Sequence, residues 1–142
     1  MENRFHMEFS AVSENESFAR LCISAFLLPC DPTVNDMTDI KTAVSEAVTN
    51  AIIHGYEGVE NGIVTLDARL EKNILHIKVS DTGKGIANIE EARKPLFTTG
   101  SDRERSGMGF TVMEAFTDKM AVESEVGKGT TVTMQKRLKC YG

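Results

Sequence analysis

The chain has 142 residues, of which 41% are apolar and 26% are charged, and its formal net charge is −5. This length suffices for one sizeable core but would crowd two, so we expect a single domain over residues 1–142. Its apolar runs fall short of the roughly 20 residues that cross a bilayer, and its negative charge argues against direct nucleic-acid binding.

The first residues and the cysteines bear on the cellular compartment of the protein. The start of the chain shows neither a basic segment followed by an apolar core nor an Arg-rich transit pattern, so we expect a cytoplasmic protein. Cys22, Cys30 and Cys140 are odd in number and lack metal-ligand spacing, with Cys22 on an apolar helical stripe. We therefore predict no disulfide framework.

The first half of the chain reads as a strand and two helices. Apolar and polar residues alternate over 5–9, which predicts a short half-buried strand. Ser13 and Glu16 predict a capping box for a helix that runs to Pro29. A second amphipathic stripe predicts a helix from 37 to 55, which ends at a glycine.

The second half adds strands in hairpins. Alternation over 64–70 and 75–79 predicts two antiparallel strands joined by a tight turn. A last hairpin is predicted from 120–126 and 131–138, around Gly127-Lys128-Gly129. Strands mixed with helices, without βαβ regularity, indicate an α+β fold: a two-layer sandwich with helices on one face of a mixed, mostly antiparallel sheet.

Between these hairpins lies a long glycine-rich and polar region, 81–109. Connections of this length are commonly functional, so we expect a lid at about 88–107, with at most a short helical piece near 89–94. Helical spacing resumes at 109–118.

Glu46 and Asn50 are the most informative pair, because residues four apart share one side of a helix. They fall away from the centre of the apolar stripe, so they are free to face something other than the sheet. A carboxylate and a carboxamide placed in this way suit phosphate chemistry, since together they can orient a hydroxyl and hold a hard divalent cation through oxygen. A solvated helix flank would show the same two residues.

Two glycine-rich segments complement this pair. Asp81 directly follows a predicted strand, and a carboxylate there can accept a hydrogen bond from an exocyclic amine while Gly83 and Gly85 let the main chain approach a flat ring. Gly107 and Gly109 precede a helix, where free N–H groups can cradle phosphate oxygens. A plain turn would explain the first segment equally well.

Two further polar groups fit such a site. Arg105 precedes the second glycine segment and can supply a cation to a terminal phosphate, although a solvated arginine fits the sequence equally well. Thr130 opens the last predicted strand, where its hydroxyl can reach a purine through water, although a β-branched residue also simply favours a strand.

The order of these segments resembles the N, G1, G2 and G3 boxes of the GHKL ATP-binding fold, shared by gyrase, the mismatch-repair ATPases and histidine kinases. The likeness is closer to the bacterial serine kinases that act as anti-sigma factors, in particular their sporulation branch. It is carried by residues 45–56, by Phe97-Thr98-Thr99 at the end of the lid, and by 105–110, and it covers essentially the whole chain.

This resemblance implies roles for individual residues. Glu46 would act as general base toward an attacking hydroxyl, with Arg105 as a second catalytic residue, and Asn50 would coordinate Mg2+ bridging the phosphates of ATP or ADP. The residues implied in nucleotide binding are Asn50, His54, Asp81, Gly83, Gly85, Ile86, Thr98, Thr99, Ser106, Gly107, Met108, Gly109, Phe110 and Thr130.

The resemblance also implies partners. Members of this family form homodimers, bind a sporulation sigma factor of the sigma-F type, and phosphorylate an anti-anti-sigma protein on serine. ATP and ADP would then bias the choice of partner through the lid. Arg20 and Glu16 on the first helix are our candidates for part of the partner surface, although plain solvent exposure explains these two charged residues more simply.

Other readings stay open. A general-stress, anti-sigma-B type kinase has the same boxes and a different sigma partner, and a nucleotide-dependent binding module would need Glu46 only for structure. The ATPase core of a histidine kinase would need a phosphoacceptor histidine on a dimerisation helix, whereas His6 lies in a strand-like segment.

Overall fold

The computed structural model describes residues 2–56, 61–89 and 109–140. In chain order its elements are β1 (Glu2–Ser10), α1 (Asn15–Leu27), the 3-10 turn η1 (Leu28–Cys30), α2 (Val34–Asn50), the π-helical turn η2 (Ala51–Gly55), β2 (Ile63–Glu71), β3 (Ile74–Asp81), a helical segment at 109–115, β4 (Lys119–Glu125) and β5 (Gly129–Arg137). The predicted elements are confirmed, except that most of the piece expected near 89–94 lies outside the described residues. None of the helices described combines the length and the apolar character needed to cross a bilayer.

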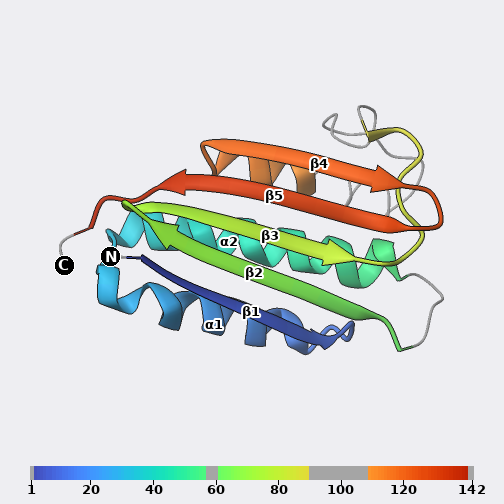
Figure 1. Cartoon of the computed structure of the whole chain (residues 1–142), viewed down its shortest axis with the longest axis horizontal. Coiled ribbons are helices and arrows are strands. Elements are labelled where there is room, and N and C mark those ends of the chain that lie inside the picture. The colour runs from blue at the N-terminus through green and yellow to red at the C-terminus, as the bar shows by residue number, and fades with distance from the viewer. Residues whose placement is uncertain (1, 57–60, 90–108, 141–142) are drawn as a thin grey trace.

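The five strands form one sheet in the order β1-β2-β3-β5-β4. Helices α1 and α2 and the segment 109–115 cover one face of this sheet (Figure 1). The predicted two-layer α+β architecture is therefore confirmed. The sheet is more regular than expected, because every described strand pair is antiparallel.

The core lies between the sheet and the helices. Strands β2 and β3 bury every second side chain, as their alternating sequences require. Facing them, α1 buries Ala19, Ile23 and Leu27, and α2 buries a stripe that runs from Ile40 to Val48. Each large apolar side chain buried in this way contributes about 1.5–3 kcal/mol to folding.

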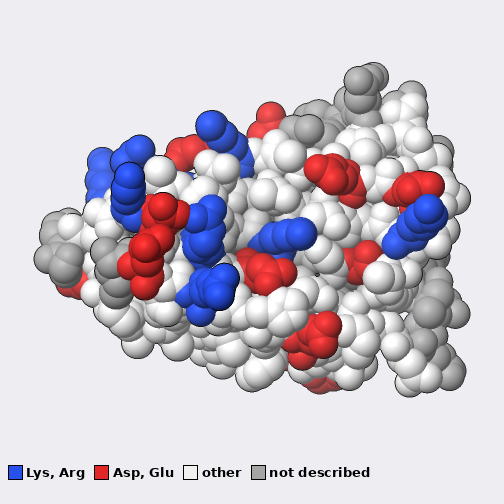
Figure 2. All heavy atoms as spheres, in the orientation of Figure 1, with Lys and Arg blue, Asp and Glu red and all other residues white. Residues whose placement is uncertain are grey.

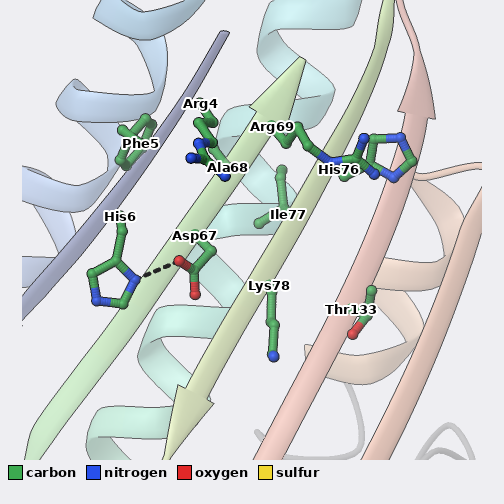
Figure 3. Close-up of a pocket in the computed structure, with 10 residues that line it drawn as sticks. All are labelled: Arg4, Phe5, His6, Asp67, Ala68, Arg69, His76, Ile77, Lys78 and Thr133. Atoms are coloured by element: carbon green, nitrogen blue, oxygen red, sulfur yellow. Dashed lines mark hydrogen bonds and ion pairs between the residues drawn. The ribbon is translucent and has the colours of Figure 1, made fainter. Parts of the chain in front are cut away.

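The other face of the sheet carries no helices. Figure 2, drawn from this side, shows lysine and arginine side chains interspersed with carboxylates. Between the edge strand β1 and its neighbour β2, Nδ1 of His6 lies 2.5 Å from the carboxylate of Asp67 (Figure 3). This outer face is therefore a polar surface.

The predicted capping box at the start of the first helix is wrong. Glu14 is the N-cap of α1 and makes no capping hydrogen bond through its side chain. Glu16 is drawn away from the cap because its carboxylate accepts a hydrogen bond from the Ser45 hydroxyl on α2 and pairs with Arg20 at 3.6 Å. A contact between two helices therefore replaces the local cap.

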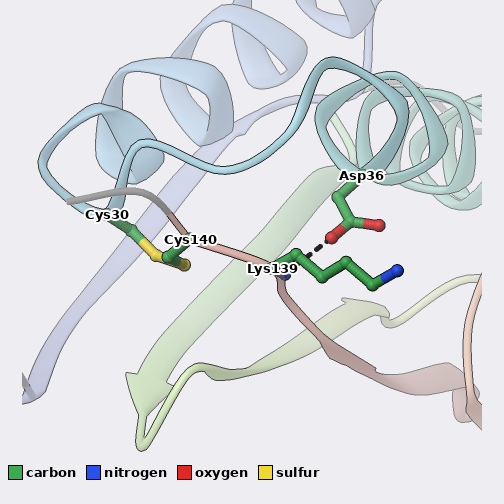
Figure 4. The surroundings of a disulfide bond; sticks show 4 residues. All are labelled: Cys30, Asp36, Lys139 and Cys140. Carbon is green, nitrogen blue, oxygen red and sulfur yellow. Dashed lines mark hydrogen bonds between the residues drawn. A yellow bond between two sulfur atoms is a disulfide. The ribbon is translucent and has the colours of Figure 1, made fainter.

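The prediction that the cysteines form no disulfide is also wrong. Cys30 and Cys140 are bonded, although 110 positions separate them in the sequence, while Cys22 is free. The pairing arises because Cys140 leaves the last strand beside Pro32, just before α2 (Figure 4). Spacing along the chain carries no signal of this tertiary contact.

Lys136 anchors the start of α2 to β5. Its side chain is only 12% exposed, and its ammonium lies 3.5 Å from the Asp39 carboxylate and 3.9 Å from that of Asp36. The main-chain N–H of Lys139 donates a second bond, of 2.7 Å, to Asp36 (Figure 4). The beginning of α2 is thus fixed, and its far end carries the candidate site.

Candidate functional site

Glu46 and Asn50 lie one turn apart at the end of α2, and both are half-buried. The neighbouring Ala47 and Val48 point into the core, which directs the two polar side chains away from the sheet centre. Asn50 ends α2, and the chain continues directly into the π-helical turn η2. Such turns are rare and occur frequently at functional sites.

The carboxamide of Asn50 is a buried polar group that can bind a ligand. Its nitrogen is buried and has no hydrogen-bond partner among the residues that the structure describes. An unsatisfied buried polar group costs about 1–3 kcal/mol, so a bound molecule, ion or water is expected to satisfy it. The amide oxygen and nitrogen exchange places on a flip of the side chain, so either atom can face that ligand.

Gly109 brings the third helical segment to this carboxamide. A Cβ at position 109 would lie 2.9 Å from Nδ2 of Asn50 and 3.3 Å from its Oδ1. Only a residue without a side chain permits this approach. The segment that starts at Gly109 therefore packs against the end of α2. A site shared by the Glu46–Asn50 pair and the second glycine-rich segment requires this contact.

Asp81 is the one buried charged side chain within the described residues, with 8% of its surface exposed. It continues the inward-facing row of β3, so its carboxyl points toward the helices rather than the open face. Burial raises its pKa, and main-chain N–H groups of Gly83, at 3.0 Å, and Thr130 oppose that rise by donating hydrogen bonds. A carboxyl held in this way, among apolar neighbours, is typical of a functional site.

Close main-chain packing holds Asp81 against η2. A Cβ at Gly55 would lie 2.7 Å from Cγ of Asp81, and a Cβ at Gly83 would lie 1.7 Å from the Gly55 carbonyl oxygen. The same oxygen accepts a 2.8 Å hydrogen bond from the N–H of Lys84. The turn after β3 is thereby clamped to the end of the second helix.

The β4–β5 hairpin holds the other side of this turn. Gly85 has a φ of +74°, and a Cβ there would lie 2.1 Å from the carbonyl oxygen of Glu125. The hydroxyl of Ser124 accepts a 2.7 Å hydrogen bond from the N–H of Ile86 and lies 2.8 Å from the Thr130 hydroxyl. The Asp81 turn, β4 and the start of β5 therefore form one connected wall.

Two residues of this wall were missed in the sequence. Ser124 is a polar residue on the inward side of β4, at the position where the alternation calls for an apolar one. Tyr56 is buried, and its hydroxyl accepts a 2.7 Å hydrogen bond from the N–H of Thr82 and lies 2.5 Å from the Ile63 carbonyl oxygen. Only the break in the β4 alternation was a usable signal.

The structure brings together many of the predicted site residues. They are Glu46, Asn50, Asp81, Gly83, Gly85, Ile86, Gly109, Phe110 and Thr130. The side chain of Phe110 is buried in the core. The backbone of His54 lies in η2. Thr98, Thr99, Arg105, Ser106, Gly107, Met108 and the greater part of the predicted lid lie outside the described residues.

The polar residues near Asn50 suit a metal ion that is coordinated mainly by the phosphate groups of a bound ligand. The part of the chain that the structure describes has no group of three His, Cys, Asp or Glu residues able to hold a metal ion. Mg2+ commonly takes one or two protein ligands and completes its octahedron with phosphate oxygens and water. A single carboxamide oxygen beside a half-buried carboxylate suits this pattern.

The comparisons with known proteins agree with the fold. A family model described as the histidine kinase-like ATPase domain matches residues 9–136. Among solved structures, the RsbU and RsbW domains of a Mycobacterium tuberculosis protein share the fold with a TM-score of 0.71 and 23% identity, over 96% of this chain and 32% of that chain. The catalytic domain of histidine kinase ThkA gives a TM-score of 0.56 at 17% identity, over 94% of this chain and 97% of that one. The chain is a GHKL-type ATPase domain.

Comparison with curated relatives identifies the family within this class of ATPase domains. The anti-sigma F factor of Geobacillus thermodenitrificans is 59% identical over 138 residues, which are 97% of this chain and 94% of the relative. The anti-sigma F factor of Clostridium perfringens strain SM101 is 55% identical over 138 residues, 97% and 99% of the two chains. This chain belongs to the anti-sigma F factor family.

Proposed function

We propose that the protein is an ATP-dependent serine kinase that also acts as an anti-sigma factor in the cytoplasm. It binds a sporulation sigma factor of the sigma-F type and phosphorylates the anti-anti-sigma antagonist of that factor on serine. The observation that carries the kinase half is the end of α2, where Glu46 lies one turn before Asn50 and Gly109 packs against the Asn50 carboxamide, whose nitrogen has no hydrogen-bond partner among the described residues. Family membership carries the anti-sigma half.

Glu46 and Asn50 have different roles in this mechanism. Magnesium-bound ATP, when present, supplies the phosphoryl group that is transferred. The carboxylate of Glu46 accepts the proton of the substrate serine hydroxyl, which makes that oxygen a better nucleophile. The carboxamide oxygen of Asn50 would hold the magnesium ion.

The nucleotide base binds to the wall formed by the Asp81 turn, β4 and the start of β5. The ionised carboxylate of Asp81 accepts a hydrogen bond from the exocyclic amine of adenine, and Thr130 completes this part of the site. The glycines of the Asp81 turn leave room for a flat ring because no side chain projects there.

We place part of the protein-partner surface on α1. Arg20 is 41% exposed at its side chain and is oriented by Glu16, which also bonds to Ser45 on α2. Phe18 and Leu21, on the same helix, are 49% and 68% exposed. Aromatic side chains and arginines are enriched at protein interfaces.

The experiment that tests this function is a phosphotransfer assay. The purified chain is incubated with labelled ATP, Mg2+ and each candidate anti-anti-sigma protein of its host, and the labelled serine is located by mass spectrometry. Transfer to one candidate is the expected result. ATP binding without transfer to any candidate would instead identify a nucleotide-dependent binding module.

Asn50→Ala is expected to remove most of the magnesium-dependent part of ATP affinity. Calorimetric titration of the parent and the variant, each with and without Mg2+, measures that part directly. Equal ATP affinity of the parent protein with and without the metal would contradict the role of Asn50.

Asp81→Asn is expected to weaken adenine-nucleotide binding by about tenfold, because an amide cannot replace both acceptor atoms of the carboxylate. Since burial raises the pKa of Asp81, the affinity of the parent for ATP should fall as the pH drops through that raised value and the carboxyl takes up a proton. The variant should lack this pH dependence. Competition by GTP as strong as that by ATP in the parent would show that Asp81 does not read adenine.

Gly83→Ala is expected to lower the free energy of unfolding by about 1–3 kcal/mol and to weaken nucleotide binding, because the new methyl group would displace the Gly55 carbonyl. Gly127→Ala is the matched control. Its Cβ would meet nothing within 4 Å, and its φ of +81° costs about 1 kcal/mol. Chemical denaturation and nucleotide titration of both variants separate the two effects, and equal nucleotide affinities would contradict the clamp.

A further inference from the structure

The outer face of the sheet has a hollow that the proposed function does not use. Its volume is about 610 Å3, and charged and polar side chains from β1, β2, β3 and β5 line it (Figure 3). It lies on the opposite side of the sheet from Asp81, because its charged and polar lining residues on β2 and β3 alternate with the buried ones. A hollow of this size is within the range of small-molecule sites.

Two rows of side chains cross the strands in this hollow. One row is made of Arg4 on β1, Arg69 on β2 and His76 on β3, which are direct partners in the sheet register. Like charges placed directly opposite one another destabilise a sheet. Burial lowers the pKa of His76, and the neighbouring charge of Arg69 lowers it further.

The second row contains charges of both signs. It contains His6, Asp67 and Lys78, again as direct partners across β1, β2 and β3. The single carboxylate of the lining, Asp67, is engaged by His6 at 2.5 Å. The hollow therefore carries three permanent cations against one carboxylate, in a chain whose net charge is −5.

Two of the three cations are available to a ligand. Arg69 is paired with Glu71 on its own strand, whereas Arg4 and Lys78 form no ion pair within the described residues. An arginine guanidinium binds phosphate or carboxylate oxygens through two parallel hydrogen bonds, and a lysine ammonium adds a point charge. Thr133 contributes a hydroxyl to the same hollow.

We propose that this hollow is a binding site for a small molecule that carries two or more phosphate or carboxylate groups. The excess of cations provides the attraction, and the opposed Arg4 and Arg69 provide a charge repulsion that such a ligand relieves. A second copy of the chain fits less well, because two faces with the same excess charge repel each other. None of the large apolar residues that the described chain exposes lines the hollow.

The histidines provide local probes for the test. Pyrophosphate and citrate are titrated separately into the full chain at constant ionic strength, and the ring resonances of His6 and His76 are followed by NMR. We expect saturable shifts of both ring resonances. The two arms distinguish phosphate from carboxylate ligands.

Variants test whether the shifts come from a site. Arg4→Gln and Lys78→Gln are each expected to weaken binding by about tenfold. Lys41→Gln, which removes the same charge from α2, is the control and should bind as the parent does. Circular dichroism checks that all three variants remain folded.

Three results would overturn the proposal. The first is no saturable shift of the His6 and His76 resonances with either anion. The second is a shift that Arg4→Gln and Lys78→Gln leave unchanged, as expected from ionic strength. The third is a dependence of the His6 and His76 resonances on protein concentration without anion, with dimers in sedimentation, which would assign this face to self-association. None of these results depends on kinase activity, so the proposed function is tested separately.

Discussion

Glu46→Gln is expected to lower the rate of phosphotransfer by about 10²- to 10⁴-fold, while the affinity for ATP stays close to that of the parent. The glutamine keeps the size of the side chain and removes only the proton acceptor. The carboxylate is half-buried on α2, one turn before Asn50, so the substitution leaves the apolar stripe of the helix in place. Initial rates with labelled ATP and a calorimetric titration measure the two quantities.

Glu123→Gln is the matched control for this variant. Glu123 is an exposed carboxylate on the outer side of β4, away from the end of α2, and its loss changes the net charge by the same amount. Its transfer rate should equal that of the parent. A rate for Glu46→Gln that also equals the parent's would remove the general base from the mechanism and leave Glu46 a structural residue.

Reduction of the Cys30–Cys140 disulfide is expected to lower the free energy of unfolding by about 2–4 kcal/mol. The bond closes a loop with a sequence separation of 110, so its loss releases a large part of the chain in the unfolded state. The reduced protein should remain folded, because the N–H of Thr33 still donates to the Lys139 carbonyl at 3.0 Å and Lys136 still pairs with Asp39. Denaturant titrations with and without a thiol reductant measure the difference.

Cys140→Ser and Cys22→Ser complete this experiment. Cys140→Ser should reproduce the loss seen on reduction, and added reductant should then have no further effect. Cys22, a free and half-buried residue of α1, should respond to neither treatment beyond a small packing cost. An identical unfolding midpoint for the oxidised and reduced parent would contradict the stabilising role of the bond.

The helices and strands could be predicted because their signals are local. The alternation of β2 and β3 and the stripe of α2 each record which side of one element is buried. The alternation of β3 also contained a functional signal, because Asp81 occupies an inward position that an apolar residue would otherwise take. Ser124 is a second exception of this kind on β4, and its role could have been inferred in the same way.

The contacts that could not be predicted join distant parts of the chain. Glu16 has the right spacing from Ser13 for a capping box, yet the tertiary contact with Ser45 outweighs the local one. The approach of Gly109 to Asn50 and the pairing of Cys30 with Cys140 depend on how the layers pack. Residues at fixed spacing can suggest such a site, but only the packing shows which atoms meet.

The antiparallel register also determines how the molecule can be tethered. Glu2 pairs with Glu71 and Arg137 pairs with Ile74, so the first described residue and the exit of β5 lie at the end of the sheet where β3 begins. Asp81 lies at the opposite end, about 25 Å away along β3. An affinity tag at either end of the chain would therefore attach the protein to a sensor surface with its nucleotide pocket turned toward the flowing solution.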